Sequence, residues 1–168
     1  FGTVGSPQVF DSLAAVASST TRYVSLKWSD PLGASQNDYD LFVLGSAGTN
    51  VITYSAAEQS GTQDPVELVS FTAAAGLTYR IVVVLYSGLP RALRVDTHRG
   101  RLSIATRGST FGHNGGQNTM CVAATHWGSG RYGVQAFNGT GNPIETFSSD
   151  GPRRIFYYPD GSAITPGN

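Results

Sequence analysis

Four oxygen-bearing side chains, those of Asp30, Asn37, Asp38 and Asp40, follow a short run that ends at Trp28. Side chains two positions apart on a strand point to the same face, so Asp38 and Asp40 are expected together, and the other two can approach from the preceding loop. Calcium prefers hard oxygen ligands in a loose shell, and a carboxylate cluster without a cation suffers like-charge repulsion. The pattern therefore allows a calcium site made by these four residues.

The same residues also have an interpretation without a metal. Asp30 and Asn37 are typical of turns, where their side chains form hydrogen bonds with nearby backbone. Asp40 would then cap a buried backbone group or pair with an arginine, because an uncompensated buried charge is costly. The spacing is not that of the calcium loop of helix-loop-helix proteins, and both interpretations stay open.

The segments that position these side chains have β-strand patterns. Residues 23–28 alternate, with Val24, Leu26 and Trp28 on one face and Tyr23, Ser25 and Lys27 on the other. Further strands are expected at residues 38–44, 51–54, 65–72, 78–86, 92–96 and 102–106, separated by segments rich in Gly, Pro, Ser, Asn and Asp. Strands at this spacing predict a mainly β protein whose first part is an antiparallel, jelly-roll-like β-sandwich.

Three details of this sandwich follow from the pattern. Residues 79–86 are the most apolar and β-branched run, which is typical of a central strand covered on both faces. The Arg99-Gly100 step predicts a tight hairpin that joins residues 93–95 to 102–104. Residues 10–17 are compatible with either a short helix or a first strand, and there is hardly another helical signal.

The composition limits the classes of partner. Lys and Arg total 11, as do Asp and Glu, so the formal net charge is zero and no basic surface for nucleic acid or anionic lipid is expected. No membrane span is visible either. Charged residues make up 13% of the chain, about half the usual share. With many Gly, Ser and Thr residues, this composition predicts a secreted or cell-surface bacterial β-protein.

Two motifs after residue 107 introduce a different chemistry. A Gly-rich stretch, residues 108–116, leads to an expected apolar strand at 120–125, and after a variable loop comes Phe147-Ser148-Ser149-Asp150-Gly151-Pro152. This order resembles subtilisin-like serine proteases (subtilases), in the region between the oxyanion-hole asparagine and the nucleophilic serine. The similar part covers roughly residues 107–155. The lone cysteine, Cys121, lies in the apolar strand and is expected to be a buried structural thiol.

The resemblance implies roles for three residues. Gly112 and His113 would line the pocket that receives the side chain before the scissile bond. Phe147 would lie near the substrate cleft on the leaving-group side, with core packing as the alternative. The catalytic Asp, His and Ser motifs of the family have no match here, and a serine nucleophile needs a positioned base. Because His98, His113 and His126 also lack a nucleophile context, the chain is not expected to be active alone.

The leading hypothesis joins the two parts. Residues 1–106, of which 1–7 are a lead-in, would be a β-sandwich inserted into the protease, and residues 107–168 would be a partial α/β catalytic-domain segment with little helix. The sequence around Asp30 and Asp40 also resembles jelly-roll domains of bacterial secreted proteases. The parent enzyme would cleave protein substrates, while the sandwich would dock a substrate or partner, or add stability outside the cell with bound calcium.

Two rival hypotheses remain. The first is a carbohydrate- or protein-binding sandwich, which predicts exposed aromatic residues on one face, with Tyr54, Tyr86, Trp127 and Tyr132 as candidates. The second is a structural domain of a surface protein, which predicts no ligand. The protease hypothesis instead predicts an exposed apolar side in the last third of the chain, because too little apolar surface is present there for an independent core.

Overall fold

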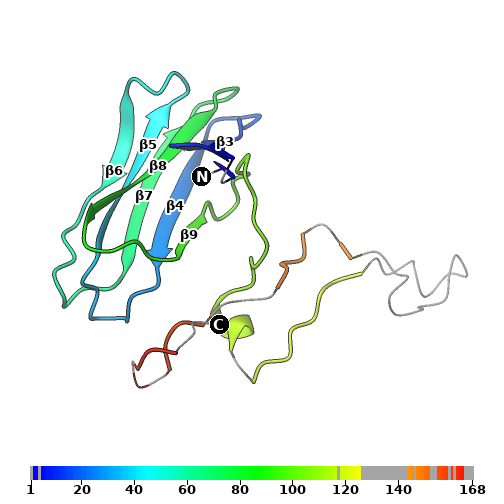
Figure 1. Cartoon of the computed structure of the whole chain (residues 1–168). Coiled ribbons are helices and arrows are strands. Elements are labelled where there is room, and N and C mark those ends of the chain that lie inside the picture. The colour runs from blue at the N-terminus through cyan, green and yellow to red at the C-terminus, as the bar shows by residue number, and fades with distance from the viewer. Residues whose placement is uncertain are drawn as a thin grey trace, which may run out of the picture. The chain divides into compact units, whose positions relative to one another are not determined.

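The computed structural model describes residues 2–3, 5–116, 118–125, 144–145, 147–151, 155–158, 160 and 162–164. The chain divides into two compact units, residues 1–105 with 159–162 and residues 106–158 with 163–168 (Figure 1). We call them the sandwich unit and the second unit. The predicted boundary after residue 106 lies beside this division, while the identity of each unit stays a prediction.

The sandwich unit is built from antiparallel sheets. One has the order β3 (Asp11–Leu13), β8 (Tyr79–Ser87), β5 (Asp38–Gly45) and β6 (Val51–Ser55). The other has the order β7 (Val66–Ala73), β4 (Thr20–Trp28) and β9 (Leu93–Asp96). A short pair, β1 (Gly2–Thr3) and β2 (Ser6–Pro7), precedes them. The protein is therefore mainly β and sandwich-like with little helix, as predicted.

The core lies between these two sheets. Alternation along β4 buries Val24, Leu26 and Trp28 and leaves Tyr23 exposed, which confirms the predicted face. Across the core, the ring of Trp28 lies 5.2 Å from that of Tyr39. Burying such apolar surface contributes about 25 cal/mol per Å² removed from water. The two sheets are therefore held together by the apolar side chains at every second position, which point into the core.

The predicted hairpin around Arg99 and the strand at residues 102–106 are wrong. Residues 97–100 form a turn in which Gly100 N donates to Thr97 O (2.9 Å) and His98 has a φ of 58°. The following segment bridges Leu102 to Leu13 of β3 instead of pairing with β9. Polar contacts explain the choice, because the buried Asp11 carboxylate accepts from Ser103 Oγ (2.7 Å). Of the two structures left open for residues 10–17, a short helix or a first strand, the strand is the one that forms, as β3.

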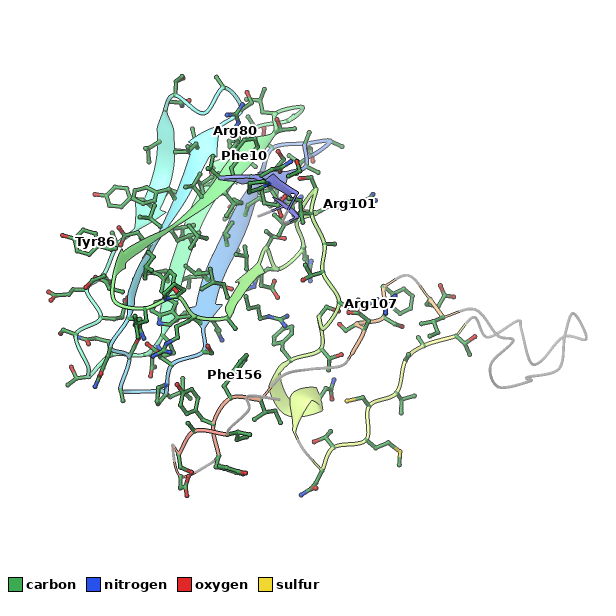
Figure 2. The ribbon with its side chains drawn as sticks, viewed as in Figure 1. Phe10, Arg80, Tyr86, Arg101, Arg107 and Phe156 are labelled. Carbon is green, nitrogen blue, oxygen red and sulfur yellow. The ribbon has the colours of Figure 1, made fainter. Side chains whose placement is uncertain are left out.

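Strand β8 differs from its prediction on one face. It lies inside the sheet between β3 and β5, and Tyr79 and Ile81 point into the core. Its outward side chains become open only toward the end of the strand: Arg80 and Val82 are half-buried, whereas Val84 is 39% exposed and Tyr86 more so. Among the described residues the expected cover on both faces is therefore missing at the end of the strand, where the inward Leu85 is also 37% exposed. Figure 2 shows Tyr86 projecting away from the strands.

The second unit has little regular structure among its described residues. It contains the 3-10 helix η1 (Gly112–Gly115) and two isolated bridges, Thr125 to Ile144 and Tyr157 to Ala163. The expected strand at 120–125 does not form. Among the described residues this segment has one isolated bridge, from Thr125 to Ile144, and no neighbouring strand with which it forms a continuous ladder. Cys121 is exposed, so the predicted buried thiol is also wrong. No helix in the described chain is long and apolar enough to cross a membrane.

Candidate functional site

The carboxylate of Asp30 is the hub of a buried polar network in the sandwich unit. Its side chain accepts hydrogen bonds from Asn37 Nδ2 (2.8 Å), Asn37 N (3.1 Å) and Ser35 Oγ (2.9 Å). Arg91 Nε donates to Asp30 Oδ1 at 2.8 Å and adds a positive charge. Both carboxylate oxygens are therefore fully engaged by protein donors.

Further bonds extend the network to both loops at this end of the sandwich. Trp28 Nε1 donates to Ser35 Oγ (2.9 Å), which orients the indole at the end of β4. The side-chain oxygen of Asn37 accepts from Leu89 N at 2.6 Å. The carboxylate of Asp30 and the side-chain amide of Asn37 thus join residues 28–37 to residues 89–91.

The hydrogen bonds decide the ionisation of Asp30. Burial alone would raise its pKa, but the donors on Asn37 and Ser35, together with the charge of Arg91, outweigh that effect. The pKa therefore lies below its ordinary value near 3.8. Asp30 is ionised at neutral pH and stabilised by partners from both loops.

These contacts bear on the expected calcium site. Asp30 and Asn37 have already used the oxygens that a cation would need, and the described residues contain no group of three His, Cys, Asp or Glu side chains that could hold a metal. The set of Asp30, Asn37, Asp38 and Asp40 does not fit a calcium shell. It matches the alternative of turn hydrogen bonds, except that the arginine pairs with Asp30 and not with Asp40.

A second carboxylate network was not anticipated from the sequence. Glu67 on β7 is 2% exposed and accepts from Gln59 Nε2 (2.8 Å), Ala57 N (3.1 Å) and Ser55 Oγ. It is in phase with the buried Val69 on the same strand. That inward phase is the signal that could have revealed a buried glutamate.

Asp40 lies in the field of other carboxylates. Burial, and then the negative charges of Asp38 and Glu67, raise its pKa above the ordinary value. Asp38 itself is buried, and its Oδ1 has no hydrogen-bond partner among the described residues. This side of the sandwich unit therefore carries negative charge that is not neutralised locally.

In the second unit, Asp150 ties together segments that are far apart in sequence. Its Oδ1 accepts from Ser109 Oγ (2.8 Å), Ser109 N (3.0 Å) and Gly108 N (3.1 Å). Its backbone oxygen accepts from Thr110 N at 3.0 Å. The hydrogen bonds from Ser109 lead the effects that lower the pKa of Asp150. The Gly-rich stretch and the Phe-Ser-Ser-Asp-Gly segment are therefore neighbours in space.

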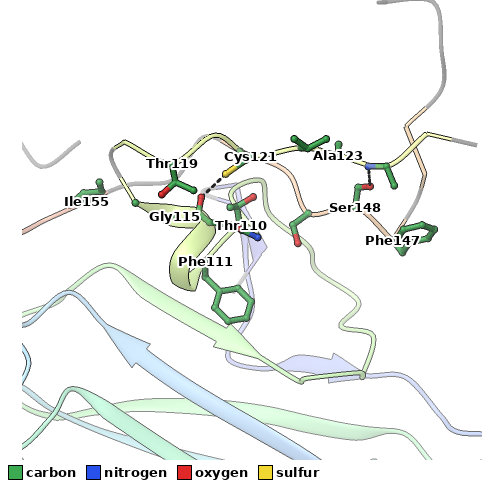
Figure 3. Close-up of a pocket in the computed structure, with 15 residues that line it drawn as sticks. Thr110, Phe111, Gly115, Thr119, Cys121, Ala123, Phe147, Ser148 and Ile155 are labelled. Atoms are coloured by element: carbon green, nitrogen blue, oxygen red, sulfur yellow. Dashed lines mark hydrogen bonds between the residues drawn. The ribbon is translucent and has the colours of Figure 1, made fainter. Parts of the chain in front are cut away.

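The apolar segment between them joins the same group. Ala124 N donates to Ser148 Oγ (3.0 Å), and Glu145 N donates to Ala124 O (2.9 Å). Cys121 Sγ donates to Asn114 O at 2.6 Å, which links this segment to η1. Figure 3 shows the hydrogen bonds of Cys121 and of Ser148 beside one cavity.

The cavity has a volume of about 770 Å³. Its described walls carry apolar side chains such as Phe111, Val122 and Ile155, polar ones such as Thr110, and no charged side chain. Phe147 lies on this wall and is largely exposed, so it is not packed in a core.

The other predicted site residues are distributed as follows. Gly112 begins η1 but is not among the residues that line the cavity, and the side chain of His113 lies outside the described part. His126, Trp127 and Tyr132 also lie outside the described residues. His98 belongs to a turn, where its backbone N–H donates to Asp96 Oδ1 at 2.7 Å.

Comparisons with protein-family models, curated protein sequences and solved structures give no match for this chain. The function of the chain is therefore inferred from the order of its motifs and from the contacts described above.

Proposed function

We propose that this chain is a non-catalytic portion of a secreted subtilisin-like serine endopeptidase. The single observation that carries the proposal is the set of hydrogen bonds from Gly108, Ser109 and Thr110 to Asp150. Those bonds join, in space, the motifs whose order along the chain carries the resemblance. Under this proposal the cavity beside them belongs to the substrate cleft.

The exposed side chains of the second unit support the same proposal. Met120 is 89% exposed and Val122 is 87% exposed, although both belong to the most apolar segment of this unit. Large apolar side chains in contiguous exposed positions usually mark a contact surface. In a subtilisin-like catalytic domain, further strands of the same protein would cover them.

The cavity chemistry suggests what such a cleft would accept. An apolar wall with a few hydroxyl and amide groups suits an uncharged side chain, since a buried charge would find no counter-ion there. Cleavage would proceed through an acyl-serine intermediate, with the nucleophile and its base supplied outside the matched segment.

The test is to determine the complete coding sequence and assay the complete protein. We expect Asp and His motifs before this segment, a Gly-Thr-Ser motif after it, and labelling of that serine by a fluorophosphonate probe. Asp150→Ala should lower kcat/KM by about tenfold or more because it loosens the cleft wall, whereas Glu58→Ala, exposed on the sandwich unit, should not. An open reading frame without those motifs refutes the proposal.

A second candidate is a binding sandwich, and one observation favours it. The rings of Phe42 and Tyr54 are stacked with centroids 5.8 Å apart, and Tyr54 is 63% exposed. Exposed aromatic side chains supply contact area at low entropic cost in protein interfaces. Under this candidate, the open face of the sheet that contains β5 and β6 is the contact surface for a protein.

A further inference from the structure

The open face of the β3-β8-β5-β6 sheet has an apolar row across its middle. Tyr39, Leu41 and Val43 of β5 are buried, so Phe42 between them points outward. In the register of the sheet, Phe42 lies opposite Tyr54 of β6 and Val82 of β8. We call Tyr54, Phe42 and Val82 the central row. Because Tyr54 is mostly exposed, nothing in the described chain covers this end of the row.

A charge of opposite sign lies on each side of the central row. Asp40 pairs with Val84 at one end of the face, and Arg80 pairs with Leu44 at the other. Each charged position is two residues, about 7 Å, along the strands from the row. The guanidinium of Arg80 lies over the ring of Phe10, 4.4 Å from its centroid (Figure 2). The face is therefore apolar in the centre, acidic at one end and basic at the other.

Neither charge has a partner of opposite sign among the described residues. The ion pairs found there join Arg91 to Asp30 and Arg94 to Asp96. Asp40 is also in the field of Asp38 and Glu67, and its raised pKa reflects burial and those charges. A cation placed against this carboxylate would stabilise its ionised form.

We propose that this face is the contact surface of a two-fold symmetric dimer of this chain, in which Asp40 of each protomer pairs with Arg80 of the other. A two-fold axis that lies in the interface along the central row exchanges the acidic and basic ends. An interface of this kind needs a self-complementary patch, in which residue i contacts residue j and j contacts i. The same operation brings each Tyr54 and Phe42 against the central row of the partner.

The sequence pattern and the overall charge favour a second copy as the occupant. Residues 81–86 are continuously apolar, as in a strand covered on both faces, yet Val84 and Tyr86 on the outer face of β8 are exposed. A stacked sheet would cover it at the usual spacing of about 10 Å. The formal net charge is zero, so two copies meet without long-range repulsion. This inference concerns the sandwich unit and holds whether or not the protease proposal does.

The size of the face sets the strength of association. Five residues of each of β6, β5 and β8, with the three residues of β3, at a strand spacing of about 4.8 Å, cover on the order of 300 Å² of flat area. That is below the roughly 800 Å² per partner of standard stable complexes. We expect a weak dimer that forms between about 10 µM and 1 mM protein.

The test combines sedimentation velocity with charge reversal. The unmodified chain should show a concentration-dependent dimer. Asp40→Arg alone and Arg80→Asp alone should each weaken it by about tenfold or more, because symmetry makes every substitution reverse two pairs. An equimolar mixture of the two variants should recover a heterodimer, and the chain with both substitutions should dimerise with itself. Lys27→Glu, exposed on the other sheet, is the matched control and should change nothing.

Other outcomes overturn the proposal. A chain that stays monomeric up to 1 mM, the concentration limit set by about −4 kcal/mol of binding, would refute it, as would single variants that dimerise normally or a mixture that does not recover. Far-UV circular dichroism and melting temperatures report whether each variant folds. If Arg80→Asp unfolds because it leaves Phe10, Arg80→Gln and Tyr54→Arg give the same test. Binding of an oligosaccharide that Tyr54→Ala abolishes, without dimerisation, would assign the face to a sugar instead.

Discussion

Replacing Asp30 by alanine removes the acceptor at the centre of the buried network. Asn37 then loses the acceptor for both its backbone and side-chain N–H groups, and each buried donor left unpaired costs about 1–3 kcal/mol. Ser35 Oγ can turn to Asn37 O, which is 3.0 Å away, and Arg91 is partly exposed and can reach water. We therefore expect Asp30→Ala to lower the free energy of unfolding by about 3 kcal/mol, which is a large share of the 5–15 kcal/mol typical of a domain.

Urea unfolding of the whole chain, followed by tryptophan fluorescence, measures this loss. The chain has two tryptophans, and Trp127→Phe leaves Trp28 as the reporter, whose Nε1 donates into the network at 2.9 Å. The melting temperature should fall by roughly 10–15 °C. Asp64→Ala is the matched control, because Asp64 is exposed and its side chain accepts a bond from Gly33 N at 2.7 Å, with no buried partner. It should cost less than about 1 kcal/mol.

The pH dependence gives an independent check. The folded pKa of Asp30 is depressed, so its stabilisation is complete above the unfolded value near 3.8 and is lost as pH falls through the folded pKa. The difference between Asp30→Ala and the parent should therefore shrink in strong acid. A loss under about 1 kcal/mol at pH 7 would refute the reasoning. So would stabilisation of the parent, but not of Asp30→Ala, by calcium, because Asp30 would then be a ligand.

Three further outcomes are expected. Asp40→Asn should stabilise the chain slightly at neutral pH and have no such effect below pH 3.8, because a raised pKa means that ionising this carboxyl opposes folding; urea titrations at both pH values measure it. Glu67→Ala should cost about 3 kcal/mol, since Gln59 and Ser55 lose their acceptor in a buried position, whereas Glu58→Ala should cost almost nothing. Native protein should react with Ellman's reagent at Cys121 without denaturant, and protection until unfolding would show that the thiol is covered.

The strands and their buried faces could be predicted where the signal depends only on residues close together in the sequence. Val24, Leu26 and Trp28 alternate with polar or aromatic neighbours, and a period of two assigns a face without knowing the partner strand. The same rule applied to β7 would have shown that Glu67 points inward. A buried glutamate was therefore predictable from the pattern of β7, although its partners Gln59, Ala57 and Ser55 were not.

The partners of each polar group were not predictable. Arg91 is 61 residues from Asp30, and Asp11 meets Ser103 across 92 residues. Such pairs depend on which strands become neighbours, and sequence spacing does not contain that information. The predicted hairpin at Arg99 failed for the same reason: the turn forms, but the residues after it bond to Asp11 and Leu13 of β3 instead of pairing with β9. Of the four residues proposed as calcium ligands, the hydrogen bonds join Asp30 to Asn37, and the positive charge beside Asp30 is the guanidinium of Arg91.

Strand β8 shows how a failed prediction can carry information. Its pattern describes the surroundings that the strand has in the working protein, and those include any second molecule that covers the sheet. A strand with Val84 and Tyr86 exposed on its outer face is costly in water, because exposed apolar area forgoes about 25 cal/mol per Å². Burial of this face by a second molecule would explain why its outer side chains are apolar. The opposite charges of Asp40 and Arg80 would then fix the orientation of that molecule. Charge reversal of these two residues therefore tests whether the apolar outer face of β8 belongs to an interface.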